Sequence, residues 1–168
     1  MNSQELIIEL NKIIKDLKGF VLITGMTGRG KSHVAMHVYY LFTPYELPLV
    51  DHDMAWFINI SELPFLIEKN RKEFGDTLGF LEKRAAPKLL VLDDLGTMRD
   101  PSPSFADFIY LLVEKRHQAR AGKITIVTTN LNSQQIRERY GDAFLSRIAS
   151  GKNYKLEGKD RRFENLGF

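Results

Sequence analysis

A glycine-rich segment near the start of the chain has the residue types and spacing of a phosphate-binding loop. The run Gly25-Met-Thr-Gly-Arg-Gly-Lys31-Ser32 matches the pattern G-x-x-x-x-G-K-S/T at every position. Its glycines permit a tight turn whose backbone N–H groups point at phosphate oxygens. The lysine can contact the β- and γ-phosphates, and the serine hydroxyl is a ligand for Mg²⁺. Arg29 is expected to face solvent or a neighbouring subunit. The pattern predicts that ATP and Mg²⁺ bind at the following residues: Gly25, Met26, Thr27, Gly28, Arg29, Gly30, Lys31, Ser32 and His33.

Polar side chains also end two apolar runs further along the chain. In LLVLDD (89–94), two adjacent carboxylates follow apolar residues, and because neighbouring residues of a strand face opposite ways they should have separate tasks. Asp93 would hold Mg²⁺, mostly through its water shell, and Asp94 would face the γ-phosphate and polarise the attacking water. Asn130 ends ITIVTTN (124–130) and would orient that water, although an Asn after a strand is also ordinary turn chemistry.

Segments typical of strands and of helices alternate around these residues. Apolar runs of buried-strand type occupy 20–24, 55–60, 89–94 and 124–130, and 153–157 is a candidate for a fifth strand. Helical patterns occupy 3–18, 31–42, 61–84, 105–120 and, as one or two short helices, 133–149. Asn2 and Glu5 are spaced as a capping box for the first helix, which Gly19 is expected to end. The alternation predicts an α/β fold, a three-layer sandwich around a five-stranded, mainly parallel sheet, with ligands beyond the carboxyl ends of the strands.

The composition is that of a globular protein with one domain. The chain has 168 residues, of which 43% are hydrophobic and 27% are charged. No apolar run approaches the roughly 18 residues that span a bilayer, and the N-terminus does not resemble a signal peptide. Cysteine is absent, which excludes disulfides and thiolate metal sites. We therefore expect a cytoplasmic protein without membrane contacts. The net charge of +3 is compatible with nucleic-acid contact but is too small to indicate it alone.

Five segments occur in the order found in AAA+ ATPases, and the chain resembles this family over nearly its whole length. They are GMTGRGKSHVA, LLVLDDLG, ITIVTTNL, Tyr140-Gly-Asp with the following Leu-Ser-Arg-Ile, and Gly158-Lys-Asp-Arg-Arg. More narrowly, the chain is similar to the DnaC/DnaI-type helicase loaders of bacteria and phages and to the related IstB transposition ATPases. The resemblance implies an AAA+ core of the P-loop NTPase class at 19–168 with no helical lid domain. The segment 1–18, which the apolar pattern predicts to be an amphipathic helix, precedes this core.

The resemblance also implies roles for individual residues. Asp94 would be the catalytic carboxylate and Asn130 the sensor beside it. Arg147 looks like the arginine finger, which reaches the γ-phosphate bound by a neighbouring subunit; a planar guanidinium donates several hydrogen bonds to developing charge. Arg162 or Arg161 looks like the second sensor, which contacts nucleotide in its own subunit. The alternatives are a surface ion pair for Arg147 and a charged tail for the doublet.

For the whole chain, the resemblance implies an ATPase, slow as an isolated subunit, that acts in DNA replication. It would assemble on single-stranded DNA and load or remodel a replicative helicase. An IstB-like ATPase that delivers a transposase is an alternative that the sequence does not separate from the first. A small-molecule kinase of the P-loop class is a more remote alternative. It would need a lid with arginines between the third and fourth strands, but that interval has an ordinary amphipathic helical pattern at 105–120. A switch that only binds nucleotide is disfavoured by the intact Lys31, Asp93, Asp94 and Asn130.

Three groups of basic residues are candidates for contacts with the DNA backbone, since loader-type proteins are expected to hold single-stranded DNA inside a spiral assembly. Acidic residues interleave with them, so solvated helix faces are the alternative. The groups are Lys69, Arg71 and Lys72; Lys83 and Arg84; and Lys115, Arg116, Arg120 and Lys123.

Overall fold

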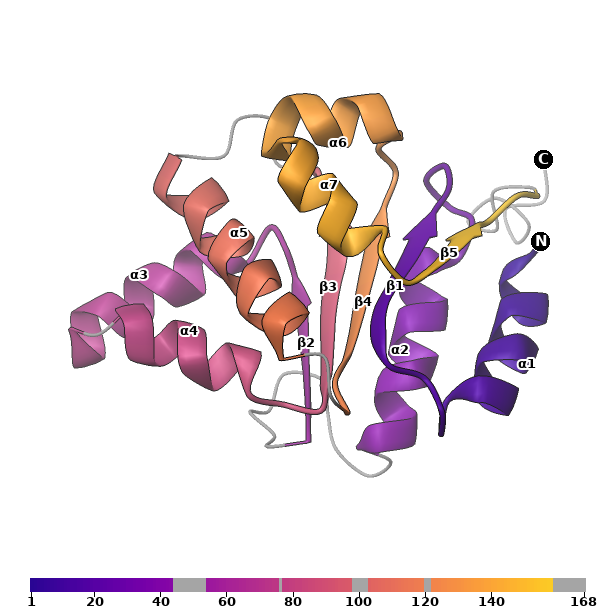
Figure 1. Cartoon of the computed structure of the whole chain (residues 1–168), viewed down its shortest axis with the longest axis horizontal. Coiled ribbons are helices and arrows are strands. Elements are labelled where there is room, and N and C mark those ends of the chain that lie inside the picture. Colours follow the sequence, from indigo (N-terminus) through magenta and orange to yellow (C-terminus); the bar gives the residue numbers. More distant parts are fainter. Residues whose placement is uncertain (44–53, 76, 98–102, 120–121, 159–168) are drawn as a thin grey trace, which may run out of the picture.

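A parallel β-sheet forms the centre of the molecule (Figure 1). A computed structural model describes residues 1–43, 54–75, 77–97, 103–119 and 122–158. Within these ranges the sheet has five strands in the order β2-β3-β4-β1-β5, and all pairings are parallel. The strands are β1 (Gly19–Thr24), β2 (Ala55–Asn59), β3 (Leu89–Leu95), β4 (Ile124–Thr129) and β5 (Lys152–Lys155). This arrangement confirms the predicted α/β fold, and it brings all carboxyl ends of the strands to one edge.

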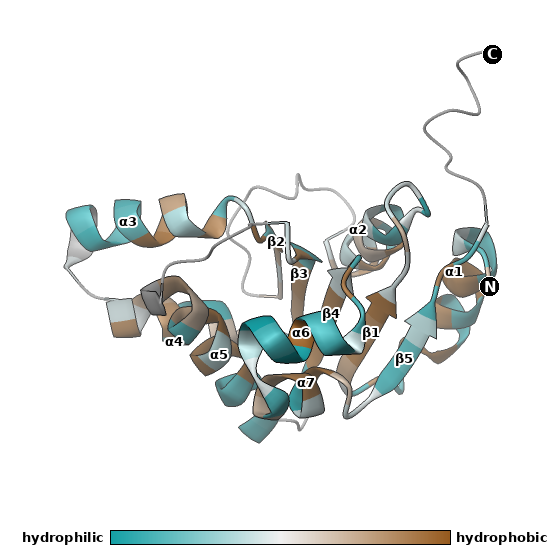
Figure 2. Ribbon diagram, turned by 90° about the horizontal axis from the view of Figure 1, so that it is seen from above, coloured by the Kyte–Doolittle hydropathy of each residue, from teal (hydrophilic) through white to brown (hydrophobic). Residues whose placement is uncertain are grey.

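Helices cover both faces of the sheet (Figures 1 and 2). One face carries α1 (Ser3–Ile13) and α2 (Lys31–Phe42). The other face carries α3 (Leu63–Phe74), α4 (Thr77–Ala85), α5 (Pro103–Gln118), α6 (Ser133–Tyr140) and α7 (Asp142–Ile148). Because both faces are covered, the three central strands β3, β4 and β1 are buried along nearly their whole length.

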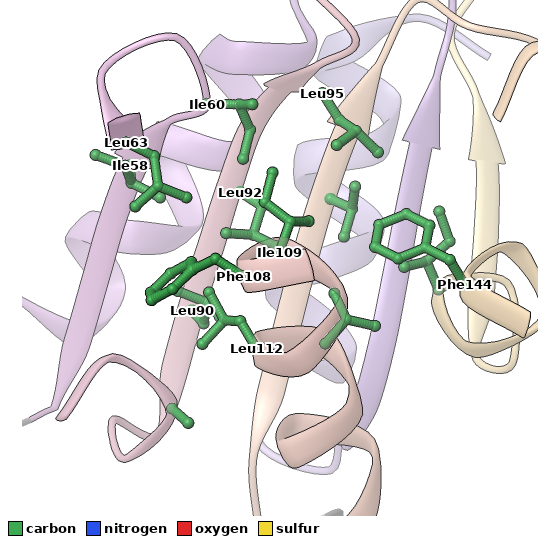
Figure 3. Packing of buried hydrophobic residues seen from close by; sticks show 14 of the residues in the cluster. Ile58, Ile60, Leu63, Leu90, Leu92, Leu95, Phe108, Ile109, Leu112 and Phe144 are labelled. Carbon is green, nitrogen blue, oxygen red and sulfur yellow. The ribbon is translucent and has the colours of Figure 1, made fainter. Parts of the chain in front are cut away.

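The core consists of two apolar clusters, one on each side of the sheet. On the α5 side, Leu90 and Leu92 of β3 pack against Phe108, Ile109 and Leu112 of α5 (Figure 3). The positions on α5 recur every three or four residues, which is the spacing of one helix face. On the other side, side chains of α1 and α2 meet the opposite faces of the same strands. Both clusters therefore fix the positions of β3 and β4, the strands that end in polar residues.

The first helix confirms one part of its prediction and corrects another. The capping box is present, with the Asn2 side chain accepting from the Glu5 N–H and Glu5 accepting from the Asn2 N–H. The helix ends at Ile13, however, well before Gly19. A turn closed by the hydrogen bond from the Asp16 N–H to the Ile13 oxygen follows it and connects it to β1. Leu17 lies outside the helix and is nevertheless buried. The apolar pattern to residue 18 thus reflects burial of a turn as well as a helix face.

No helix within the described part of the chain is long and apolar enough to cross a membrane.

Candidate nucleotide site

The predicted phosphate loop joins the end of β1 to the start of α2. Gly25, Gly28 and Gly30 have positive φ angles of 148°, 79° and 85°, which L-residues with a side chain rarely adopt. At Gly25 a Cβ would also lie 2.6 Å from the backbone oxygen of Leu156. Gly30 is the N-cap of α2 and has no side chain to occupy the first N–H groups of that helix. These groups and the helix dipole favour an anion at this point.

Lys31 lies across this loop. Its side chain is buried, with 6% of its surface exposed. The ammonium group donates to the backbone oxygens of Gly25, at 2.8 Å, and Met26, at 3.0 Å. A buried ammonium needs such acceptors because it has lost its hydration. The loop thus holds a positive charge at the first turn of α2, where a phosphate group would complete its neutralisation.

A cavity of about 490 Å³ opens over the loop. Its lining brings together residues that are far apart in the sequence: Thr27, Gly28, Gly30, Lys31, Ser32, His33 and Asp94. Three other residues of the predicted loop, Gly25, Met26 and Arg29, do not line it. The Met26 side chain is 70% exposed. The structure therefore brings the catalytic carboxylate predicted from LLVLDD to the phosphate loop, with a cavity between them.

Asp93 does not line this cavity, but it is hydrogen-bonded to Ser32, which does, and it is only 4% exposed. Burial raises the pKa of Asp93, while hydrogen bonds from the hydroxyls of Thr128 and Ser32 oppose that increase. A carboxylate and a hydroxyl that face one another supply the oxygen ligands that Mg²⁺ prefers. Among the described residues, no group of three or more acidic, His or Cys side chains is arranged to hold a metal ion. A magnesium ion here would therefore be held by Ser32, Asp93, phosphate oxygens and water, a donor set that suits it.

Asp94 has an unusual backbone conformation. It is the one non-glycine residue in the described ranges with a positive φ, 62°, a region that Asp and Asn tolerate better than most residues. In the pairing of β3 with β4, Leu92 is opposite Val127 and Leu95 is opposite Thr129. Two residues of β3, Asp93 and Asp94, therefore lie opposite a single residue of β4. This irregularity is a β-bulge in β3. The separation of the two carboxylates arises from this bulge rather than from simple strand alternation.

The polar end of β4 lies beside the end of β3. Thr128 and Thr129 are fully buried, and Asn130 is exposed directly after the strand. Thr129 pairs with Leu95, so Asn130 lies at the same edge of the sheet as Asp94. Its contact with a lytic water stays a prediction. Sequence reasoning did not assign a role to Thr128, although its place in TTN beside LLVLDD was the available signal.

Arg147 lies on α7 and is engaged within its own chain. Its Nε pairs with Glu114 of α5, its Nη1 donates to the Ala143 oxygen at 2.8 Å, and its guanidinium lies 5.4 Å from the centre of the Tyr110 ring. The hydrogen bond from Arg147 lowers the pKa of Glu114. Both charged side chains are 23% exposed. This is the ion pair that was the alternative to an arginine finger, and a role for Arg147 in a neighbouring subunit stays a prediction.

Most of the basic candidates for DNA contact are engaged in contacts within the chain. The prediction is wrong for Arg116, which is 1% exposed and donates to backbone oxygens inside the fold. Lys123 donates to the Ala85 oxygen, and Lys115 pairs with Glu82. Three further contacts are Arg71 and Lys72 with Glu68, and Arg84 over the Trp56 ring. Arg120 and the predicted second sensor, Arg161 or Arg162, lie outside the described residues.

Three solved structures of replication proteins share this architecture. The DnaC helicase loader aligns with a TM-score of 0.70 at 23% identity, over 92% of this chain and 89% of its own. DnaI aligns with a TM-score of 0.69 at 16% identity, over 94% and 83%. A DnaA bound to AMPPCP and single-stranded DNA aligns with a TM-score of 0.73 at 17% identity, over 95% and 47%. The chain has the AAA+ fold.

The structural alignments establish the fold, whereas identities between 16% and 23% leave the activity to be argued from the site. The chain spans about half the length of the DnaA that it matches, 47%. No protein-family model matches the sequence, and no curated protein matches it either. In the AAA+ core seen here, the phosphate loop follows β1 and the two carboxylates end β3, so each predicted group occupies a carboxyl end of a strand.

Proposed function

We propose that this chain is an ATPase that binds ATP and Mg²⁺ at the cavity between the phosphate loop and the end of β3. One observation carries the proposal: Lys31, Ser32 and Asp94 line a single cavity, and Asp93 is hydrogen-bonded to Ser32. A chance match of the loop pattern would not be expected to bring the loop next to two carboxylates from another strand. The structure of DnaA bound to AMPPCP supports nucleotide as the ligand of this fold.

The residues have separate tasks in this proposal. The N–H groups of the loop and the Lys31 ammonium bind the phosphates, and Ser32 and Asp93 hold the metal ion. Bound Mg²⁺ would neutralise charge that develops on the phosphates. Asp94, which lines the cavity, would orient a water and accept its proton. Asn130, at the same edge, would hold that water in line.

We further propose a role in DNA replication, in which the chain assembles on single-stranded DNA and loads or remodels a replicative helicase. The support is the shared fold with DnaC, DnaI and a DnaA bound to single-stranded DNA. Arg147 would act on nucleotide in the neighbouring subunit, so hydrolysis would depend on assembly. In its own chain it is paired with Glu114, and assembly would have to exchange that partner for phosphate.

The nucleotide proposal is tested by binding of a fluorescent ATP analogue to the wild type and to Lys31→Ala. Hydrogen bonds to charged groups contribute about 1.5–3 kcal/mol, so we expect the variant to bind about 10- to 150-fold more weakly. Lys12→Ala is the matched control, because Lys12 is an exposed lysine on α1. Equal affinity of Lys31→Ala and the wild type would overturn the proposal.

The replication proposal is tested by ATP turnover measured across protein concentration, with and without single-stranded DNA. Turnover that rises with both supports assembly on DNA. Recovery of the host's replicative helicase on the immobilised chain supports loading, whereas recovery of a transposase instead would favour an IstB-like function. Turnover that is flat in both variables, with no helicase recovered, would count against the replication role.

A further inference from the structure

Thr128 occupies the position in β4 that lies opposite the bulge in β3. Its side chain is fully buried. The hydroxyl donates to Oδ1 of Asp93 at 2.6 Å and accepts the backbone N–H of Asp94 at 2.8 Å. A threonine hydroxyl has a single proton to donate, and that proton is directed at Asp93. One hydroxyl thus contacts both residues of the acidic pair.

The bulge explains why a side chain is needed at this point. Between Leu92 and Leu95 the regular register of β3 with β4 is interrupted. A buried N–H without an acceptor costs free energy comparable to a lost hydrogen bond. The Thr128 hydroxyl supplies an acceptor for the N–H of Asp94, and so stabilises the backbone of a residue whose φ is 62°. Bulges of this kind redirect a side chain next to an active site.

We infer that Thr128 is a positioning residue of the nucleotide site. By holding Oδ1 of Asp93 it fixes the orientation of the carboxylate that faces Ser32. By holding the N–H of Asp94 it keeps the bulge that directs the second carboxylate into the cavity. The inference rests on the proposed ATPase function and adds a residue that acts on metal and water only through Asp93 and Asp94.

Thr129, the next residue, is a natural control for a purely structural effect. It is also fully buried. Its hydroxyl donates to the Leu95 oxygen at 2.6 Å and accepts the Leu131 N–H at 3.1 Å. Thr128 and Thr129 therefore each make one donated and one accepted hydrogen bond, and each donates to a residue of β3. They differ in that the Thr128 hydroxyl contacts the acidic pair.

The experiment compares Thr128→Val, Thr128→Ser and Thr129→Val with the wild type. Valine keeps the shape of threonine and removes the hydroxyl, whereas serine keeps the hydroxyl. The readouts are the Mg²⁺ concentration for half-maximal binding of a fluorescent ATP analogue, the kcat for ATP, and the thermal midpoint. Loss of a partner that orients a metal ligand typically costs 10- to 100-fold. We expect Thr128→Val to raise the Mg²⁺ requirement and lower kcat by about that factor.

The other variants separate positioning from folding. Thr128→Ser is expected to match the wild type, and Thr129→Val is expected to lower the thermal midpoint while leaving the Mg²⁺ requirement unchanged. If Thr128→Val keeps the wild-type Mg²⁺ requirement and kcat, or if Thr128→Ser is as impaired as Thr128→Val, the inference is wrong. It is also wrong if Thr129→Val raises the Mg²⁺ requirement equally. If the wild type itself binds no ATP analogue, the proposed ATPase function is wrong. If the wild type binds it and Thr128→Val behaves like the wild type, only the inference about Thr128 is wrong.

Discussion

Replacement of Arg116 by methionine is expected to destabilise the fold by about 2–4 kcal/mol, for reasons that can be followed bond by bond. The guanidinium lies at the end of α5 and donates to the oxygens of Ala85, Pro87, Lys88 and Ile124 and to Oγ1 of Thr125. It therefore links α5 to the turn before β3 and to the start of β4. Burial lowers the pKa of Arg116 to about 10, because the charge has lost its hydration.

The magnitude depends on which acceptors lose their only partner. After Arg116→Met, the Ala85 oxygen still accepts from Lys123 and the Lys88 oxygen from the Ile124 N–H. The Pro87 oxygen and the Thr125 hydroxyl have no replacement donor among the hydrogen bonds of the described residues. Each orphaned buried group costs about 1–3 kcal/mol, or about 2–6 kcal/mol for the pair. Methionine carries no charge to desolvate, which offsets part of this cost, so we expect a value in the lower half of that range, about 2–4 kcal/mol.

Urea and thermal unfolding measure this prediction. For a chain of 168 residues, about 2–4 kcal/mol corresponds to a fall in Tm of about 5–15 °C. Lys115→Met is the control, because this neighbour on α5 is 42% exposed and pairs with Glu82 on the surface; it should stay within about 0.5 kcal/mol of the wild type. An Arg116→Met variant as stable as the Lys115→Met control would refute the reasoning, since the five hydrogen bonds would then contribute nothing beyond the cost of burying the charge.

Two further predictions concern Arg147, the proposed arginine finger, and the hydrogen bond between Tyr154 and Glu9, which tethers α1 to β5. Arg147→Ala should spare binding of ATP and abolish any turnover that rises with protein concentration; if turnover stays normal, the finger is another residue. Tyr154 donates to Glu9 of α1 at 2.8 Å, and burial together with this bond raises its pKa from 10.0 to about 12. Because the unfolded chain loses this proton first, the wild type should lose stability between about pH 10 and 12 relative to Tyr154→Phe in urea unfolding. Parallel curves for the two proteins would show that the tether contributes nothing.

The sequence predicts those parts of the fold that depend on neighbouring residues. The glycine and lysine pattern fixes the turn after β1 and the start of α2 at Lys31, and the predicted range 31–42 agrees with the helix. The acidic pair is likewise found from its place at the end of an apolar run. Arg116 was predicted to be a surface base, yet it continues the buried stripe of Ile109, Leu112 and Val113 at helical spacing. The helical spacing of Arg116 from these apolar residues indicated a buried position, whereas its charge favoured an interpretation as a surface residue.

Other features depend on contacts between distant residues and leave no local pattern. The bulge at Asp93 and Asp94 appears only when β3 is set beside β4, because LLVLDD alone has the regular appearance of a strand. The partner of Arg147 is Glu114, which lies on a different helix. Several glutamates were available to it on sequence grounds. Pairings of this kind are decided by how the helices pack and not by the spacing of charges along the chain.

The left-handed backbone at Asp94 limits the ways in which the protein can be trapped with nucleotide bound. Alanine or glutamine at this position would also remove the carboxylate that is proposed to act in hydrolysis. Both are ill suited to a φ of 62°, and the strain would distort the bulge that also holds Asp93. Asparagine accepts this backbone conformation and has nearly the shape of aspartate. Asp94→Asn is therefore the substitution of choice for testing the proposed hydrolysis with the bulge left intact.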